Sequence, residues 1–311
     1  MPKSKREGRV IRVTGGDVWV EVEDRLLSCV LRGRFRQRGR GVQIAAGDRV
    51  LVSTAGPDSD VGAIEEVLPR ESSLSRFIEG RDSGEKLIVA NIDMLFAVTT
   101  LRAPSVNYNF IDRVLVSAEW GEANACVCLN KIDLVEDRSE IERLAAIYTS
   151  CGYRTIRTSA KTGEGVDELE KMLQGGIYAF VGESGVGKSS LLMKMDQELD
   201  LKVRSLGEKS KKGRHTTAYS QLFPIRGGYM ADTPGIQTFG FPGTELESIS
   251  NCFPEFRDME SDCHFHRCTH SHEPDCAVKA ALEQGRVHRS RYDSYLSILS
   301  EVEARIKKKA Y

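Results

Sequence analysis

The chain has 311 residues, of which 40% are hydrophobic and 29% charged, and its formal net charge is −1. This composition is typical of a soluble globular protein with about two to three domains, and the near-neutral total gives no indication of a nucleic-acid partner. No stretch approaches the roughly 18 uninterrupted apolar residues of a membrane span, and residues 1–10 lack the apolar core of a signal peptide. We therefore expect a cytoplasmic protein with no membrane partner. We also expect a monomer.

The first region, residues 8–70, contains short runs in which apolar and polar residues alternate. The runs cover residues 9–13, 17–22 and 48–52, and glycine-rich turns separate them. Short strands at this spacing favour a small all-β barrel or sandwich.

Arginines occupy every even position from Arg32 to Arg40. In an extended chain these side chains would project to one face, which suits contact with phosphates. The alternative is a solvated edge strand that is protected by its charge. Residues 202–215 form a second basic stretch, so the near-neutral total hides local basic surfaces.

Between residues 87 and 240, apolar strands alternate with helical patterns. This rhythm predicts βαβ units and a parallel sheet. Its segments are residues 94–100, 110–120, 125–130, 141–148, 154–160, 166–173 and 177–182.

Two loops of this region have the residues of a guanine-binding site. Asn130, Lys131 and Asp133 follow an apolar strand, and nucleotide sites lie at the carboxyl ends of parallel strands. The Asp133 carboxylate can accept two hydrogen bonds from guanine N1 and N2, and adenine offers no such donor pair. A second strand is followed by residues that could support the base, which are Ser159, Ala160 and Lys161.

A phosphate-binding loop comes later in the chain. The sequence GESGVGKSS satisfies the GxxxxGK[ST] spacing between an apolar strand and a helix. Its glycines let backbone amides surround phosphate oxygens, and the helix amino terminus adds its positive dipole end. Lys188 would neutralise the β and γ phosphates, and the Ser189 hydroxyl would bind Mg²⁺. The predicted contacts are Gly182, Glu183, Ser184, Gly185, Val186, Gly187, Lys188, Ser189 and Ser190.

Two further motifs follow the phosphate-binding loop. GRHTT, residues 213–217, lies in a polar basic stretch suited to a switch loop, where Thr216 or Thr217 could complete the Mg²⁺ shell. DTPG follows another expected strand. Asp232 there can hold Mg²⁺ through its shell, and the Gly235 amide can approach the γ phosphate because no side chain obstructs it.

The order of these motifs is base, base, phosphate, switch, switch, whereas ordinary GTPases have the phosphate loop first. Joining old chain ends that lie close together, and cutting elsewhere, preserves the site in space. We therefore predict a circularly permuted GTPase in which the join runs through residues 166–182.

From about residue 246 the chain is rich in cysteine and histidine and then helical. Four cysteines lie between Cys252 and Cys276, together with several histidines. This clustering predicts a zinc site that holds together a segment too short to form its own core. The residue types alone leave the choice open among four cysteines and His264, His266, His270 and His272. Residues 291–309 are expected to form a helix whose basic end is either an rRNA contact or a solvated tail.

Taken together, the motifs of this chain resemble those of the circularly permuted, small-subunit-dependent ribosomal GTPases of the RsgA/YjeQ type. The motifs that carry the resemblance are NFIDR, NKID, GESGVGKSS, GRHTT, DTPG and CHFHRCTHSHEPDCAV. The resemblance covers nearly the whole chain. It implies an OB barrel over residues 1–72, a permuted Ras-like GTPase over 73–242 and a zinc-binding domain with a C-terminal helix over 243–311. It also implies binding to the small ribosomal subunit and its rRNA late in subunit maturation. Because an OB barrel commonly binds oligonucleotides and Phe35 interrupts the arginine series, we favour an rRNA contact for that series.

The resemblance also selects site residues. It implies one structural Zn²⁺, with four protein ligands and no open position, held by Cys263, Cys268, His270 and Cys276. Ile236 follows Gly235 where a water-orienting glutamine is expected in Ras-type GTPases, and the resemblance points to His215 as a substitute. Ala218 stands where relatives commonly have a third threonine, and we favour Thr217 as the Mg²⁺ ligand.

These observations predict a GTP hydrolase that binds GTP, GDP and Mg²⁺ and is stimulated by the small subunit. The catalytic residues we expect are His215, Thr217 and Asp232. The alternatives are a permuted GTPase of large-subunit assembly and a non-enzymatic RNA-binding scaffold regulated by nucleotide. Asp133 argues against an enzyme that uses ATP.

Overall fold

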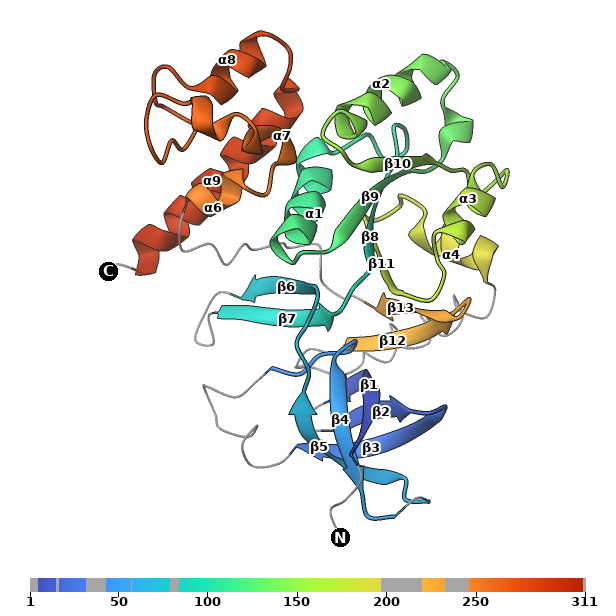
Figure 1. Cartoon of the computed structure of the whole chain (residues 1–311). Helices are drawn as coiled ribbons and strands as arrows, with labels where there is room; N and C mark the ends of the chain where they lie inside the picture. The colour runs from blue at the N-terminus through green and yellow to red at the C-terminus, as the bar shows by residue number, and fades with distance from the viewer. Residues whose placement is uncertain are drawn as a thin grey trace.

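The computed structural model describes residues 5–14, 17–31, 43–56, 58–78, 84–196, 220–232 and 246–309. These form a barrel at one end, a central sheet covered by helices, and a helical region beside that sheet (Figure 1). Within this described part of the chain, no helix has the length and apolar character that crossing a membrane requires.

The barrel consists of five strands. They run in the order β1-β2-β3-β5-β4 and close through a β1–β4 pairing, with β3 and β5 parallel. Alternate side chains point inward, so Val18, Val20 and Val22 are buried while the residues between them are partly exposed. The predicted all-β barrel is therefore confirmed. Its strands are β1 Lys5–Thr14, β2 Asp17–Val22, β3 Arg25–Leu31, β4 Arg49–Thr54 and β5 Val61–Val67.

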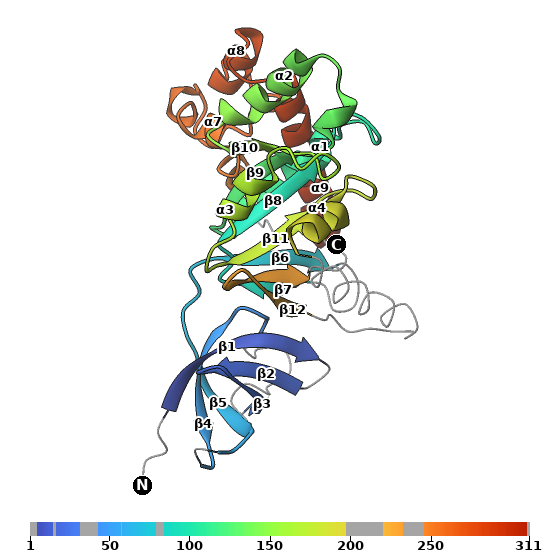
Figure 2. The ribbon, with the colours of Figure 1, turned by 90° about the vertical axis from the view of Figure 1, so that its right-hand side faces the viewer.

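A two-stranded hairpin follows the barrel, formed by β6 (Ser73–Ile78) and β7 (Gly84–Ala90). The hairpin lies between the barrel and the central sheet in both views (Figures 1 and 2). It leads directly into the first strand of that sheet.

The central sheet confirms the predicted permutation. Strands β10, β9, β8, β11 and β13 lie side by side and parallel, and β12 is antiparallel beside β13. The strand before the phosphate-binding loop, β11, lies in the middle, yet three of its companions precede it in the chain. The strands are β8 Met94–Thr99, β9 Asn124–Leu129, β10 Arg154–Arg157, β11 Ile177–Val181, β12 Ser220–Ile225 and β13 Gly228–Asp232.

Both faces of the sheet are buried, as the continuous apolar runs of its strands predict. Leu95 and Ala97 of β8 belong to the core shared with α1 (Tyr108–Trp120) and α2 (Arg138–Thr149). The alternate residues Phe96 and Val98 pack in a second core with residues of the opposite helices, α3 (Val166–Lys171) and α4 (Lys188–Met195).

The C-terminal region packs on the α1 face of the sheet. Its long helix α9 lies alongside α1 (Figure 1), and buried residues of both helices belong to one continuous hydrophobic core. A 3₁₀ turn, Ile132–Leu134, follows β9, and another, Glu260–Asp262, precedes the cysteine-rich loop. The helices are α6 Glu247–Ser250, α7 Pro254–Arg257, α8 Ala277–Glu283 and α9 Arg289–Lys309.

The barrel joins the central sheet through strand pairing. The end of β1 pairs with the beginning of β12, with Arg12 opposite Gln221 and Val13 opposite Ser220. The Ala46 amide donates to Ser220 Oγ at 3.0 Å, and the Ala90 amide donates to the Ala46 carbonyl at 2.9 Å. A short turn of the barrel is thereby hydrogen-bonded both to the hairpin and to β12.

Candidate functional site

The loop between β11 and α4 has the backbone that phosphate binding requires. Gly185 and Gly187 have φ values of 85° and 94°, which favour glycine. A Cβ on Gly187 would lie 2.4 Å from Asn130 Nδ2, and one on Gly182 would lie 2.4 Å from the Val98 carbonyl oxygen. Side chains are therefore excluded at both ends of the loop, where it lies closest to neighbouring strand ends.

Lys188 is the first residue of α4, and its ammonium group points back over the loop. Its Nζ donates to the carbonyl oxygens of Gly182 at 2.7 Å and Glu183 at 2.8 Å. Burial lowers the pKa of Lys188 from its ordinary value, and the negative charge of Glu183 opposes this shift. The cation is thus held at the loop by neutral carbonyls, where phosphate oxygens would give it anionic partners. Ser189 and Ser190 follow it as exposed residues of the first helical turn.

On the opposite side of the site, Asn130 connects three loops. The buried side chain donates from Nδ2 to the Val186 carbonyl at 2.8 Å. Its Oδ1 accepts from Thr158 Oγ1 at 3.2 Å and from the Ala160 amide at 3.3 Å. The residue expected to help select guanine therefore joins the phosphate-binding loop to both base-side loops.

Asp133 is oriented by the second base-side loop. Its Oδ1 accepts from Ser159 Oγ at 2.6 Å, and its Oδ2 lies 4.0 Å from Lys161 Nζ. Only 13% of the Asp133 side chain is exposed, whereas 81% of the Lys161 side chain is. A fixed, partly desolvated carboxylate is suited to accept the paired donors of a guanine base.

Lys131 takes a left-handed conformation at φ 59°, and its Nζ donates to the Ala103 carbonyl at 2.7 Å. This hydrogen bond fixes the side chain at the edge of the site.

The phosphate and base motifs border one cavity of about 600 Å³, a size suited to a small-molecule ligand. Two lining residues, Leu134 and Met193, are apolar side chains with 43% and 38% of their area exposed. The sequence analysis missed both, together with Lys194. Their positions, directly after NKID and in the second turn of α4, could have indicated them. The lining residues are Asn130, Lys131, Asp133, Leu134, Ala160, Lys161, Gly187, Ser190, Met193 and Lys194.

Several predicted residues lie outside the described part of the chain. These are the arginine series of residues 32–40 and His215, Thr216, Thr217 and Gly235. The backbone of Asp232 is described and ends β13, where it pairs with Gln221. Since β13 is parallel to β11, its carboxyl end lies at the same edge of the sheet as the phosphate-binding loop.

A second cluster lies in the C-terminal region. The candidate ligand atoms of Cys263, Cys268, His270 and Cys276 all lie within 4.8 Å of one another. His270 Nδ1 is 3.5 Å from Cys263 Sγ and 3.4 Å from Cys276 Sγ, so Nδ1 faces the thiols. Among the described residues, Nε2 of this buried ring has no hydrogen-bond partner.

The other metal-ligand candidates lie elsewhere. His264, His266 and His272 are exposed, and the buried Cys252 thiol donates to the Ser248 carbonyl. Burial lowers the pKa of His270, which favours the neutral imidazole that coordinates a metal. Three thiols and one imidazole match the ligands and number of a closed tetrahedral zinc site, so the residues present fit such an ion.

Helix α9 supports this cluster. The Tyr292 hydroxyl donates to the His270 carbonyl at 2.7 Å, and the Tyr295 hydroxyl donates to the Thr269 carbonyl. The Glu273 carboxylate accepts from the Thr269 amide at 2.8 Å and the Ser271 amide at 3.1 Å. These contacts shape the loop around the cluster without using any of the four candidate ligand atoms.

Comparison with known proteins gives consistent matches along the chain. The family model described as RsgA GTPase matches residues 67–242. A protein of Gemmatimonas aurantiaca named small ribosomal subunit biogenesis GTPase RsgA is 38% identical over 302 residues, covering 96% of this chain and 98% of its own. A protein of Agathobacter rectalis with the same name is 35% identical over 312 residues, covering 96% and 99%.

Two solved structures are similar over nearly their full lengths. YjeQ from Thermotoga maritima has a TM-score of 0.75 at 35% identity, covering 96% of this chain and 98% of that chain. YloQ, described as a circularly permuted GTPase, has a TM-score of 0.74 at 29% identity, covering 97% and 96%.

Proposed function

The chain belongs to the RsgA GTPase family, and we propose from this membership that it hydrolyses GTP in the biogenesis of the small ribosomal subunit. The observation that carries the GTPase assignment is that Gly187 and Ser190 of the phosphate-binding loop and Asp133 of the base-side loop line one and the same cavity. One motif supplies phosphate contacts and the other a guanine-specific acceptor. Their union in one cavity is what a guanine nucleotide requires.

Each part of the cavity has a distinct role in the proposed reaction. The amides of residues 182–187 and the Lys188 ammonium group would bind the phosphates and stabilise charge that develops on the transferring phosphoryl group. Asp133 would accept from guanine N1 and N2, and Asn130 would hold the base-side and phosphate loops in register. Bound Mg²⁺ would supply further charge neutralisation, with Ser189, Thr217 and Asp232 as the residues we assign to hold it.

The attacking water needs a group to orient it, and the sequence supplies Ile236 rather than glutamine after Gly235. We assign this role to His215. Intrinsic hydrolysis should consequently be slow, and a partner that orders the surrounding segment should accelerate it. Subunit-stimulated turnover that is unchanged in His215→Ala would contradict the assignment.

The remaining regions fit a factor that acts on the small subunit. We propose that the barrel contacts rRNA through the arginine series at residues 32–40, late in subunit maturation and in the cytoplasm. We also propose a monomer with domains over residues 1–72, 73–242 and 243–311. Structural Zn²⁺ at the three cysteines and His270 would join the loop before α8 to the rest of its domain.

A nucleotide competition experiment tests the proposed base selection. Wild-type protein should bind GTP in preference to ATP, and Asp133→Ala should lower GTP affinity by at least about tenfold because paired acceptor contacts are lost. A matched control is Asp137→Asn, because Asp137 is exposed and caps α2 away from the cavity. Equal binding of GTP and ATP by the wild-type protein would contradict the guanine assignment.

A further inference from the structure

The NFIDR motif, residues 109–113, has no role in the function derived above. It lies in the first half of α1, a helix that shares a hydrophobic core with the C-terminal region. Asp112 within it is completely buried, although aspartate is almost never buried without a partner. A buried carboxylate at this position therefore needs a partner within the core.

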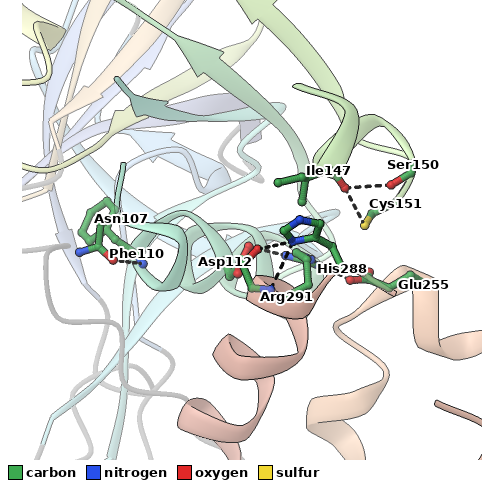
Figure 3. Close-up of polar contacts among 10 residues, drawn as sticks. Asn107, Phe110, Asp112, Ile147, Ser150, Cys151, Glu255, His288 and Arg291 are labelled. Carbon is green, nitrogen blue, oxygen red and sulfur yellow. Dashed lines mark hydrogen bonds and ion pairs between the residues drawn. The ribbon is translucent and has the colours of Figure 1, made fainter. Parts of the chain in front are cut away.

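The partner of Asp112 is Arg291 of α9, which is also completely buried. Arg291 Nη1 donates to Asp112 Oδ1 at 2.7 Å. The same guanidinium forms a two-point contact with Glu255 of α7, at 2.7 Å from Nε and 3.1 Å from Nη2. Figure 3 shows Asp112 and Glu255 reaching Arg291 from different elements. The Phe253 ring lies 4.7 Å from the guanidinium carbon, which further excludes water.

This arrangement fixes α9 against α1. A buried charge that loses its partner retains its desolvation cost, so the two helices cannot slide past each other without leaving the buried Asp112 carboxylate unpaired. Arg113, the next residue of the motif, adds an ion pair with Glu301 of α9 at 2.7 Å. Consecutive residues of NFIDR thus bind opposite charges on one helix.

The amino terminus of α1 contacts the phosphate-binding loop. Asn107 caps α1, since its Oδ1 accepts from the Phe110 amide at 3.1 Å. Its Nδ2 donates to Glu183 Oε1 at 2.8 Å. The Glu183 carbonyl in turn accepts from Lys188 Nζ. Asn107 is therefore one hydrogen bond away from the loop residue that holds the phosphate-binding lysine.

Helix α9 also contacts the loop that carries the three cysteines and His270. Tyr292 and Tyr295 of α9 bond the backbone of the cysteine-rich loop, and Arg291 lies immediately before them. A cavity of about 590 Å³ is lined both by Asn107 and Glu183 and by Ser290, Asp293 and Ser294 of α9. The C-terminal helix and the phosphate-binding loop thus border the same space.

We propose that Asn107 is a positioning residue for the phosphate-binding loop, and that the docked C-terminal region acts on the nucleotide site through it. Asp112 fixes α1 against α9, and Asn107 transmits that position to Glu183. The inference rests on the proposed function, because its consequence is measured as GTP binding and hydrolysis.

A donor-acceptor exchange tests the Asn107 contact. Asn107→Asp keeps the oxygen that caps α1 but removes the donor and places a carboxylate against Glu183. We expect it to raise the KM for GTP about threefold to tenfold with an unchanged unfolding temperature, since one hydrogen bond to a charged group is lost. In the double variant N107D/E183Q, the new amide can donate to the new carboxylate. The KM increase caused by N107D should therefore disappear when Glu183 is replaced by glutamine.

Asn109→Asp is the matched control, because it adds the same charge in the first turn of α1 while its oxygen still accepts from Arg113. This variant should leave the KM unchanged. A KM increase of equal size in N107D and N109D would overturn the proposal, as would an N107D cost that is the same in both Glu183 backgrounds.

A second experiment tests the connection to α9. Asp112→Asn should raise the KM as N107D does, and combining the two should add nothing further because both act through one contact. Glu301→Gln weakens the more exposed α1–α9 ion pair and serves if Asp112→Asn fails to fold. The proposal would be overturned if the KM increase of Asp112→Asn, or of Glu301→Gln used in its place, multiplied with the KM increase of N107D in the double variant. Wild-type turnover with small subunits reports on the proposed function separately, since it involves none of these variants.

Discussion

The two regions that flank the GTPase sheet are attached to it in different ways. The barrel has its own core of residues such as Val10, Val20 and Ile64. It joins the sheet through β1–β12 pairing, a few hydrogen bonds of the turn at Ala46, and contacts of Tyr229 with Arg9 and Glu21. The C-terminal region shares one hydrophobic core with α1 and α2, and buries an ion cluster at the junction. Damage to the second junction should therefore reach the GTPase, whereas damage to the first should remain more local.

Metal removal should have the largest effect and tests whether the C-terminal region is integral to the GTPase. Free energies of zinc binding to structural sites are about 10–16 kcal/mol, so losing the ion should unfold the loop that carries Cys263 and Cys276. Because that region shares its core with α1, we expect the main unfolding transition of the protein to move to lower temperature. Zinc analysis with calorimetry before and after chelation measures this. One zinc per chain is expected; metal-free native protein would refute the assignment.

Breaking the buried ion cluster should have the next largest effect. Asp112→Ala leaves the Arg291 charge with only Glu255, and we expect a loss of about 3–5 kcal/mol in the free energy of unfolding. Arg289→Ala is the control, because Arg289 lies on α9 close to Arg291 but its ion pair with Asp293 is exposed. The Arg289 and Asp293 side chains are 74% and 53% exposed, and such pairs contribute less than about 1 kcal/mol. Denaturant unfolding of both variants would show whether burial, rather than the ion pair itself, sets the cost.

A substitution at the barrel junction should affect the GTPase less than one at the junction with the C-terminal region. Gly47 has φ 94°, and a Cβ there would lie 1.9 Å from the Ala90 carbonyl oxygen. Gly47→Ala should therefore cost about 1–3 kcal/mol and loosen the barrel, while GTP affinity stays near that of the wild type. Limited proteolysis and nucleotide titration measure the two parts. Gly56→Ala is the control, since nothing lies within 4 Å of its added Cβ. If Gly47→Ala lowered the free energy of GTP binding as much as the free energy of unfolding, the barrel junction would not be the more local of the two junctions.

Neutralising the arginine series should have the smallest effect on stability and act only on subunit binding. Replacing Arg34 and Arg38 by glutamine should reduce the slope of log affinity against log salt by about 0.7 for each lost phosphate contact. The unfolding temperature should not change. A salt slope that equals the wild-type value would indicate that the series does not contact rRNA.

The sequence predicted those parts of the molecule that depend on local spacing. The alternating apolar residues of β1 and β2 and the glycine positions around Lys188 are dictated by local geometry. The circular permutation followed from motif order and is confirmed by the sheet order. The four candidate zinc ligands required the resemblance, because several nearby histidines have equally suitable chemistry.

Other features depend on partners that are distant in the chain. Arg291 begins a segment that was expected to form a helix, and nothing in its local pattern indicates that Asp112, far earlier, would bury it. The pairing of β1 with β12 is likewise set by tertiary packing rather than periodicity. Leu134 and Met193 belong to no motif, so only their positions close to NKID and to the phosphate-binding loop could have indicated them.

The most direct test of the account is GTP hydrolysis by the purified protein alone, with isolated small ribosomal subunits, and with isolated large subunits. We predict slow turnover alone and strong stimulation by small subunits only. Stimulation by large subunits would contradict the assignment and indicate a large-subunit factor. Turnover that neither subunit stimulates would instead indicate an RNA-binding scaffold that retains nucleotide.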